Sequence, residues 1–145
     1  LAATDQRHRA TFNGIWDVGR GFQVSGLYFF GSGQRFSTNW GGDLRNIGAA
    51  APASTGRLRA NGTLAPRNNL VGEPIHRVDV RLTKRQRIAG RLSIDGMLEV
   101  FNLFNHENYG SYTTSESNAS YGQPAFNNNV AFQPRIVQLG FRFAF

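Results

Sequence analysis

Apolar and polar residues alternate along five segments of this chain, at residues about 7–18, 22–31, 76–85, 91–101 and 134–145. Alternation predicts β-strands, because successive side chains of a strand point to opposite faces of a sheet. The last segment is the clearest: its apolar face carries Val137, Leu139, Phe141, Phe143 and Phe145. We find no convincing helical period, so the sequence predicts an all-β fold.

The charged residues of these segments share the face opposite the apolar one. They are Arg9, Asp17, Arg77, Asp79, Arg81, Asp95, Glu99 and Arg142. Because the side-chain period is two, a slip of one residue would move every charge to the apolar face. We see no amphipathic helix to cover the apolar face, and left bare it would exceed the apolar patches that monomers tolerate. Lipid is the simplest cover, and the segments have the length that a tilted strand needs to cross a bilayer.

The connections between the segments support the same architecture. Short turns follow the first segment, at Gly19-Arg20-Gly21, and the third, around Arg85 to Gly90, whereas long connections occupy residues about 32–75 and 105–133. Outer-membrane barrels have short periplasmic turns and long extracellular loops. The sequence therefore predicts part of an antiparallel, up-and-down transmembrane β-barrel with lumen-facing charges. We expect the barrel to be incomplete, because the smallest single-chain barrels have about eight strands.

Aromatic and basic residues near the segment ends refine this prediction. Barrels carry aromatic girdles at both membrane interfaces, and we expect Tyr28, Phe30, Phe101 and Phe104 at the outer one and Phe22, Phe143 and Phe145 at the inner one. Arg135 does not fit the separation of charged and apolar faces, because its place in the alternation points its side chain toward lipid. Near the outer rim its guanidinium could reach lipid phosphates.

The end of the chain resembles the C-terminal assembly signal of bacterial outer-membrane barrels, with Gln138, Gly140, Phe143 and Phe145 at the matching positions. The resemblance implies recognition by the barrel assembly machinery. The alternative is the ordinary C-terminal strand of a soluble sheet.

A second resemblance, to TonB-dependent outer-membrane receptors with Oar-like barrels, runs through nearly the whole chain. It consists of residues 5–9 (Asp-Gln-Arg-His-Arg), Ser32-Gly33 followed by Phe36, residues 77–81, the Asn-Leu-Phe-Asn run at 102–105, and the terminal phenylalanine. It implies the last five strands of a barrel of roughly twenty-two, the size of plugged transporters. It also implies the outer membrane of a Gram-negative bacterium and import of a nutrient such as a metal chelate or a saccharide.

Several partners follow from this resemblance. They are outer-membrane lipid and lipopolysaccharide, the remaining barrel strands, and the plug of the full-length receptor. Nothing in the chain resembles the plug or a TonB-contacting segment. We therefore expect a fragment or truncated product that does not transport alone. The transported ligand is not readable from the sequence.

Composition leaves two alternatives. The chain has 16 basic and 9 acidic residues, a net charge of +7 and a pI near 11.0, a balance that also suits nucleic-acid binding. A module that stacks single-stranded nucleic acid needs aromatic and basic residues on one face, whereas here they fall on opposite faces, so we expect no nucleic-acid partner. A non-transport barrel, such as an adhesin or a structural protein, shares most of these features.

The sequence does not indicate an enzyme. It has no cysteine, which excludes thiolate chemistry. Asp95 and Glu99 lie four residues apart on one strand face, roughly 13 Å at ~3.3 Å per residue, which exceeds the ~9.5 Å limit of glycosidase carboxylates. We expect them to pair with Arg77, Arg81 or Arg142. We expect no catalytic residue and no cofactor.

The histidines, His8, His76 and His106, fall at predicted strand ends near the outer rim. A metal site formed by His76 and His106 is disfavoured, because the hairpin register places them several residues out of line. We therefore expect no metal. In the long connections, Trp40, Tyr109, Tyr112 and Tyr121 are candidate ligand contacts, equally well explained by packing within the loops.

Overall fold

The computed structural model describes residues 5–42, 44, 56–127, 129 and 132–145. The chain divides into two compact units. The sheet unit comprises His8–Gly31, Ile75–Asn108 and Val130–Phe145, and the loop unit comprises Leu1–Arg7, Ser32–Pro74 and Tyr109–Asn129. Each unit is described by itself below.

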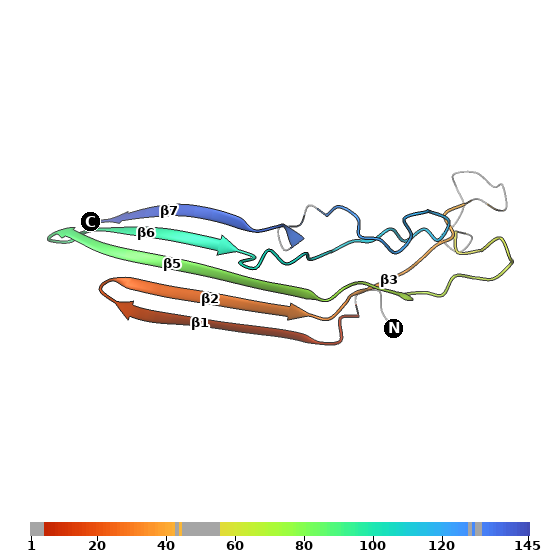
Figure 1. Cartoon of the computed structure of the whole chain (residues 1–145), viewed down its shortest axis with the longest axis horizontal. Coiled ribbons are helices and arrows are strands. Elements are labelled where there is room, and N and C mark those ends of the chain that lie inside the picture. Colours follow the sequence, from red (N-terminus) through yellow and green to blue (C-terminus); the bar gives the residue numbers. More distant parts are fainter. Residues whose placement is uncertain (1–4, 43, 45–55, 128, 130–131) are drawn as a thin grey trace. The chain divides into compact units, whose positions relative to one another are not determined.

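The sheet unit is a five-stranded antiparallel sheet in the order β1-β2-β5-β6-β7 (Figure 1). Its strands are β1 (Arg9–Gly19), β2 (Phe22–Gly31), β5 (Ile75–Ala89), β6 (Leu92–Phe101) and β7 (Ile136–Ala144). Neighbours in this sheet are also neighbours along the chain once the two short strands of the loop unit are set aside. This is the up-and-down order of a barrel wall, and the prediction of an all-β antiparallel fold is confirmed.

Strand β5 runs further than the sequence indicated. The sequence predicts that this strand ends at about residue 85, with the turn around Arg85 to Gly90, but Arg85, Gln86 and Arg87 do not turn. They instead continue the ladder and pair with Asp95, Ile94 and Ser93 of β6. The chain reverses only after Ala89, with Gly90 in the left-handed region at φ 54°.

The turn between β1 and β2 depends on glycine. Arg20 and Gly21 both have positive φ, 52° and 79°, as the commonest two-residue hairpin turns require. Gly21 also lies against the next strand, where its carbonyl accepts a hydrogen bond from the Arg85 N–H (2.7 Å). A Cβ at position 21 would meet the Arg85 carbonyl oxygen at 2.4 Å, so this turn has no room for a side chain.

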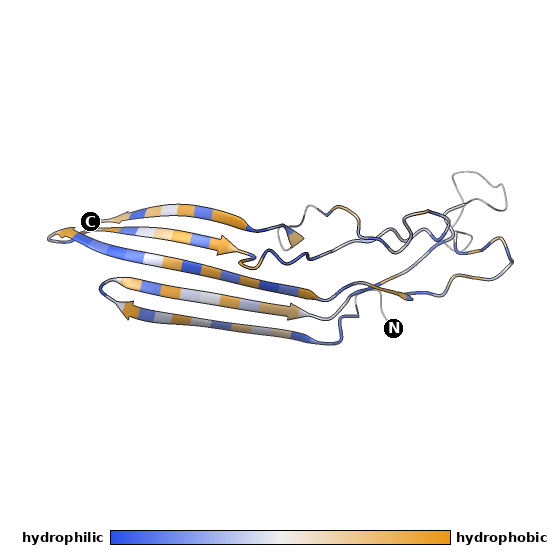
Figure 2. Cartoon of the chain, in the orientation of Figure 1, coloured by the Kyte–Doolittle hydropathy of each residue, from blue (hydrophilic) through white to orange (hydrophobic). Residues whose placement is uncertain are grey.

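The sheet unit has no apolar core of its own. The apolar residues that are buried in the described part of the chain, Ala65 and Tyr112, both belong to the loop unit. In the sheet, by contrast, Trp16, Leu139 and Phe141 are 62%, 74% and 70% exposed. Hydrophilic and hydrophobic residues alternate along its strands (Figure 2), so the apolar side chains form one face, and that face is uncovered.

The loop unit has local structure that alternation along the chain does not predict. Strands β3 (Arg35–Phe36) and β4 (Leu70–Val71) form a short antiparallel ladder. Isolated bridges join Asn39 to Ser115 and Tyr112 to Pro124. The segments that the sequence indicated as long extracellular loops are therefore held by backbone hydrogen bonds where the structure describes them.

Replacing Gly21 by alanine should destabilise the sheet more than replacing Gly19. Gly19 also has a positive φ, 90°, but a Cβ at position 19 would meet no atom within 4 Å. Gly19→Ala should therefore cost only the left-handed conformation, about 1–2 kcal/mol, whereas Gly21→Ala adds a backbone clash. Urea unfolding followed by tryptophan fluorescence measures both, and equal losses would contradict the tight packing of Gly21 on β5.

Candidate functional site

The charged face of the sheet gathers all the charged strand residues that the sequence placed together. Cross-strand partners share a face, and the register pairs Asp17 with Gln23, Arg81 with Glu99, and Asp95 with Arg142. The same parity places on this face Arg9, Asp17, Arg77, Asp79, Arg81, Asp95, Glu99 and Arg142. Whether this face lines a lumen remains a prediction, because the five strands do not close.

Three ion pairs organise this face. The Arg81 Nε donates to Glu99 Oε1 (2.7 Å) across the β5–β6 ladder, as expected. Arg77 pairs with Asp79 on its own strand (Nε–Oδ1 2.8 Å). Asp95, which is 5% exposed, is held by two hydrogen bonds from Arg85, of 2.8 and 2.9 Å.

Arg85 is a member of this face that sequence reasoning missed, because it was assigned to a turn. Its parity with Arg77 and Arg81 was the available signal. Two-pronged contact between a guanidinium and a carboxylate is the strongest common ion-pair geometry in proteins. The pair therefore fixes the end of the charged face next to the β5–β6 turn.

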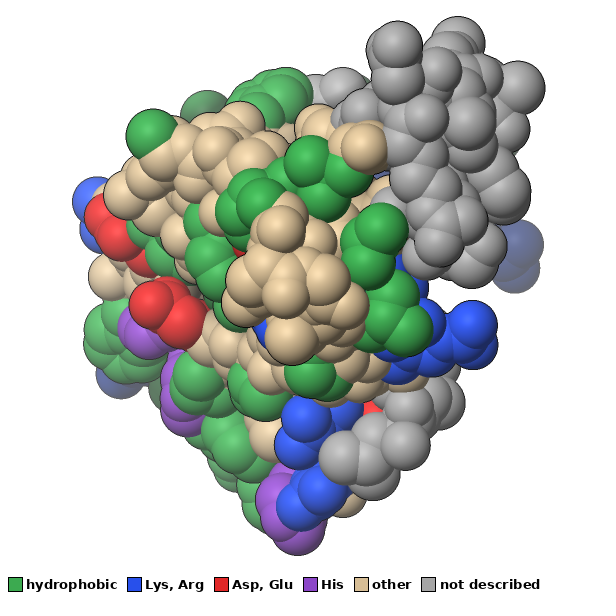
Figure 3. All heavy atoms as spheres, turned by 90° about the vertical axis from the view of Figure 1, so that its right-hand side faces the viewer, with side chains coloured by type: hydrophobic (Ala, Val, Ile, Leu, Met, Phe, Trp, Pro, Cys, Tyr) green, Lys and Arg blue, Asp and Glu red, His purple; other side chains and the backbone are tan. Residues whose placement is uncertain are grey.

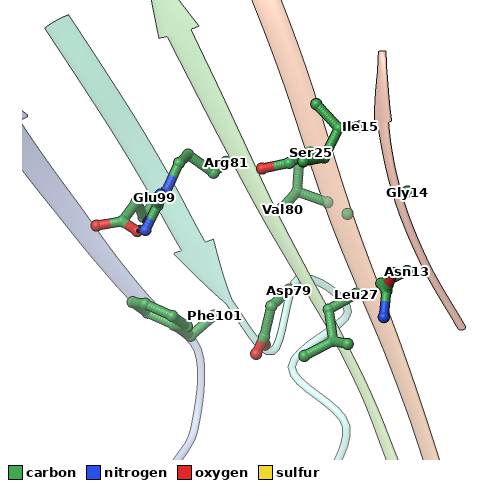
Figure 4. Close-up of a pocket in the computed structure, with 11 residues that line it drawn as sticks. Asn13, Gly14, Ile15, Ser25, Leu27, Asp79, Val80, Arg81, Glu99 and Phe101 are labelled. Carbon is green, nitrogen blue, oxygen red and sulfur yellow. Dashed lines mark hydrogen bonds and ion pairs between the residues drawn. The ribbon is translucent and has the colours of Figure 1, made fainter. Parts of the chain in front are cut away.

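A shallow hollow of about 300 Å³ lies in the middle of the charged face. Its lining includes Asn13, Ser25, Asp79, Arg81 and Glu99, together with the apolar Ile15, Leu27 and Phe101. Figure 4 shows Arg81 of β5 extending toward Glu99 of β6, with Asp79 and Phe101 beside the same hollow. The hollow offers amide, hydroxyl and charged groups at once, so it suits contact with a polar surface or solute.

Aromatic and basic residues are less strictly separated than the sequence indicated. The Arg9 guanidinium lies 5.0 Å from the Phe29 ring centroid, and that of Arg77 lies 5.6 Å from the centroid of Phe101. Phe29 and Phe101 both lie on the charged face, because their register partners do. The expected place of Phe101 in a lipid-facing aromatic girdle is therefore wrong.

A turn of three asparagines, Asn102, Asn105 and Asn108, closes the end of the sheet where β6 stops; we call it the asparagine turn. Asn102 and Asn105 have φ of 51° and 52°, a region that asparagine enters more readily than most residues. The Asn102 N–H donates to Asp79 Oδ1 (2.8 Å), and its side-chain amide donates to the carbonyls of His106 and Gln133 (2.9 and 3.3 Å). Asn102, 2% exposed, thus joins the charged face to the turn.

The asparagine turn also supplies hydrogen bonds to β5 where β6 no longer pairs with it. β2 pairs with β5 as far as Ile75, whereas β6 pairs with β5 only from Val80. Beside this uncovered stretch, the Asn108 side chain accepts from the His76 N–H (2.8 Å) and donates to the His76 carbonyl (2.9 Å). The Leu103 N–H donates to the Val78 carbonyl (2.7 Å). The backbone of β5 is therefore satisfied beyond the end of its ladder with β6.

Two histidines meet at this turn. The rings of His76 and His106 lie 5.3 Å apart between centroids, so the register argument that separated them is wrong. The Tyr28 hydroxyl lies 3.1 Å from His76 Nδ1, and Asn108 Oδ1 lies 3.3 Å from His106 Nδ1. The described residues contain no group of three or more histidine, aspartate or glutamate side chains that could hold a metal ion.

The residues of the C-terminal signal occupy the edge strand β7. Gln138 and Gly140 pair with Glu99 and Met97 on the charged face, and Phe143 pairs with Ile94 on the apolar face. Phe145 follows the strand and is 99% exposed. Recognition of these residues by assembly machinery remains a prediction.

The loop unit is held by a partly buried polar network. The Arg59 guanidinium donates to both Glu116 carboxylate oxygens (2.6 and 2.8 Å), and the Thr38 hydroxyl donates to Glu116 Oε1 (3.2 Å). These hydrogen bonds, those from Arg59 above all, hold the pKa of Glu116 below its ordinary value. The candidate ligand contact Tyr112 packs on Phe36 (5.1 Å between centroids) and accepts a hydrogen bond from Glu73 N–H (2.7 Å). For Tyr112, packing within the loops is thus the better explanation.

Removing the Asn108 side chain should open the end of the sheet. In Asn108→Ala, the N–H and carbonyl of His76 lose their partners, at about 1–3 kcal/mol for each buried group left unsatisfied. Exchange of the His76 amide hydrogen should accelerate at least tenfold. The matched control is Asn13→Ala, at an exposed position of the charged face. Unchanged exchange at His76 in Asn108→Ala would contradict this role of the Asn108 side chain.

A comparison with known protein families gives a match over most of the chain. The family model described as "Outer membrane beta barrel domain" matches residues 1–138. No curated protein and no solved structure matches the chain. In the described part of the chain no helix is long and apolar enough to span a membrane, a finding that does not bear on strands.

Proposed function

Because the chain belongs to the outer membrane beta barrel domain family, we propose that it forms part of the barrel of a TonB-dependent receptor that imports a nutrient across the outer membrane. Membership in the family implies an outer-membrane location. TonB dependence, an Oar-like barrel, the Gram-negative host and nutrient import are the further steps of the proposal.

One observation carries the barrel part of the proposal: the apolar face of the sheet is exposed, and the charged face is organised by ion pairs. Phe12, Trp16, Leu139, Phe141 and Phe143 are each at least 62% exposed. In a barrel wall, lipid covers such a face and the opposite face meets the lumen. The same arrangement in water would leave a large apolar surface bare.

The sheet edges require further strands. Among the residues that the structure describes, β1 and β7 each pair on one side only, and an unpaired backbone edge is not tolerated in hydrocarbon. We propose that additional strands of the receptor pair with both edges and that a plug contacts the charged face. The hollow lined by Asp79, Arg81 and Glu99 provides polar groups for such a contact.

The order of sequence elements favours the receptor over other barrels. The Asn-Leu-Phe-Asn run at 102–105 resembles the receptors' signature, and in this chain it builds the asparagine turn that ends β6. A metal chelate or a saccharide is the proposed cargo class. The assembly machinery would recognise Gln138, Gly140, Phe143 and Phe145, and lipopolysaccharide would surround the outer end of the apolar face.

A non-transport barrel, such as an adhesin or a structural protein, is the main alternative, because the exposed apolar face would be identical. The nucleic-acid alternative is weaker. On the charged face, the guanidiniums of Arg9 and Arg77 lie over the rings of Phe29 and Phe101, in the place that a stacked base would take. The apolar face carries most of the aromatic rings of the sheet but no comparable array of cations.

Nutrient uptake by cells lacking the gene tests the proposal. Cells of the native host, grown with metal chelates or saccharides as the limiting nutrient, should lose uptake of one labelled compound. That uptake should also stop when a protonophore collapses the inner-membrane gradient that drives TonB-dependent transport. The complementing wild-type gene restores it, and a gene that lacks the codon for Phe145 should restore less, because less protein is assembled.

The alternatives predict different results. Unchanged uptake of every compound, together with reduced attachment of the cells to surfaces, would favour an adhesin. Uptake that is lost in the deletion strain but survives the protonophore would favour a passive pore.

A further inference from the structure

A cleft of about 420 Å³ opens beside the asparagine turn, within the sheet unit. Tyr28, His76, Val78, Phe104 and His106 contribute to its lining. The register places Tyr28, His76 and Val78 on the apolar face, and Phe104 is 74% exposed. Arg77 and Asn102 complete the lining. Most of the cleft wall therefore belongs to the apolar face, at the end of the sheet opposite the two short turns.

The cleft combines an apolar wall with nitrogen donors. His76 stands in a row of rings, 5.1 Å from Phe30 and 6.5 Å from Tyr28 between centroids. The Tyr28 hydroxyl lies 3.1 Å from His76 Nδ1, and in the tautomer that accepts this hydrogen bond the His76 ring carries its proton on Nε2, where it can be donated. Since Asn108 Oδ1 only accepts, it orients His106 through the ring's Nδ1–H (3.3 Å).

A permanent positive charge lies at the same end. Arg135 is exposed, its Nη1 donates to the Leu103 carbonyl (3.4 Å), and its N–H donates to Asn105 Oδ1 (2.9 Å). Leu103 in turn donates to the carbonyl of Val78 (2.7 Å), a residue that lines the cleft, so hydrogen bonds through Leu103 connect Arg135 to the cleft wall. Arginine is well suited to phosphate oxygens, which accept two of its N–H groups together.

The apolar face carries positive charge near its two ends. Among the described residues of the five strands, Lys84 is the only charged side chain on that face. Lys84 lies near the opposite end, with its Nζ 4.2 Å from the Phe22 ring centroid and bonded to the Arg20 carbonyl. Positive groups thus bracket an uncharged band, which is the distribution that suits a bilayer with phosphate layers on both sides.

We propose that the cleft binds a phosphorylated glycolipid of the outer leaflet. An acyl chain packs against Val78 and Phe104, and a phosphate group accepts hydrogen bonds from Arg135 and from Nε2 of His76. The inference rests on the proposed function, because the barrel orientation decides which leaflet meets this end. Histidine side chains are visible at the molecular surface beside hydrophobic ones in Figure 3, and His76 is half-buried and His106 exposed.

Lipid that remains bound through purification tests the proposal. The full-length protein is extracted from outer membranes in mild detergent, and bound lipopolysaccharide per protein is measured by native mass spectrometry. The double variant Arg135→Gln/His76→Gln should retain about tenfold less, the factor expected for losing a hydrogen bond to a charged group. The matched control Lys84→Gln, on the same face at the other end, should retain the wild-type amount.

Added lipids identify the chemical group that is recognised. The delipidated wild-type protein receives bisphosphorylated lipid A, dephosphorylated lipid A, phosphatidylglycerol or inorganic phosphate, and the midpoint of thermal unfolding is recorded. Bisphosphorylated lipid A alone should raise the midpoint by several degrees. An equal rise with dephosphorylated lipid A or with phosphatidylglycerol would overturn the proposal.

Failure of the inference and failure of the proposed function are distinguishable. A folded barrel migrates differently in gel electrophoresis before and after heating. If the outer-membrane fraction contained no such heat-modifiable band of the protein, the barrel itself would be overturned. A heat-modifiable double variant that retains wild-type lipid overturns only the cleft. Loss of lipopolysaccharide in Lys84→Gln, with retention in the double variant, would show that the end with Lys84 meets the outer leaflet, and this would also overturn the cleft proposal. If the double variant does not assemble, the added-lipid series with the wild-type protein decides.

Discussion

Hydrocarbon offers no hydrogen-bond partner to a peptide group, and this constraint shapes the whole sheet unit. Every N–H and carbonyl in the membrane must be paired within the protein. The five strands pair in antiparallel ladders that leave the outer edges of β1 and β7 open for further strands, and at the two short turns glycine allows the chain to reverse. Once the backbone is paired, alternating side chains can face lipid on one side and polar groups on the other. The described part of the sheet therefore needs no apolar core, because lipid covers its apolar face.

The same constraint explains the asparagine turn. Strand β6 ends before its neighbour β5 does, which would leave the N–H and carbonyl of His76 without partners. The asparagine side chain has an amide nitrogen that donates and a carbonyl oxygen that accepts, so it can bond to both groups of a peptide unit. Asn108 uses both on His76, and Asn105 satisfies the N–H of Arg135 ahead of β7. A sequence element that resembles a family signature thus has a direct physical role.

Much of this architecture is predictable from the sequence, because the period of two is local. The alternation around Leu139 and Phe141 sets the faces, and the parity of Arg81 and Glu99 brings them together across one ladder. Other features depend on chain reversals that no local pattern reveals. Arg85 lies where a turn was predicted, yet it pairs with Asp95 in the ladder. The proximity of His76 and His106 results from the left-handed conformations of Asn102 and Asn105. The network around Glu116 joins segments far apart in sequence, so alternation gives no sign of it.

The central claim is that the apolar face lies in lipid and the charged face does not. Because the chain has no cysteine, single cysteines can be placed at neighbouring positions of β7, Leu139→Cys on the apolar face and Gln138→Cys on the charged face. Each carries a spin label, and its collisions with oxygen and with a water-soluble nickel chelate are measured in outer membranes. The account predicts that oxygen reaches the label at 139 more readily and that the chelate reaches the label at 138. Equal accessibility at the two positions, or the reverse order, would contradict it.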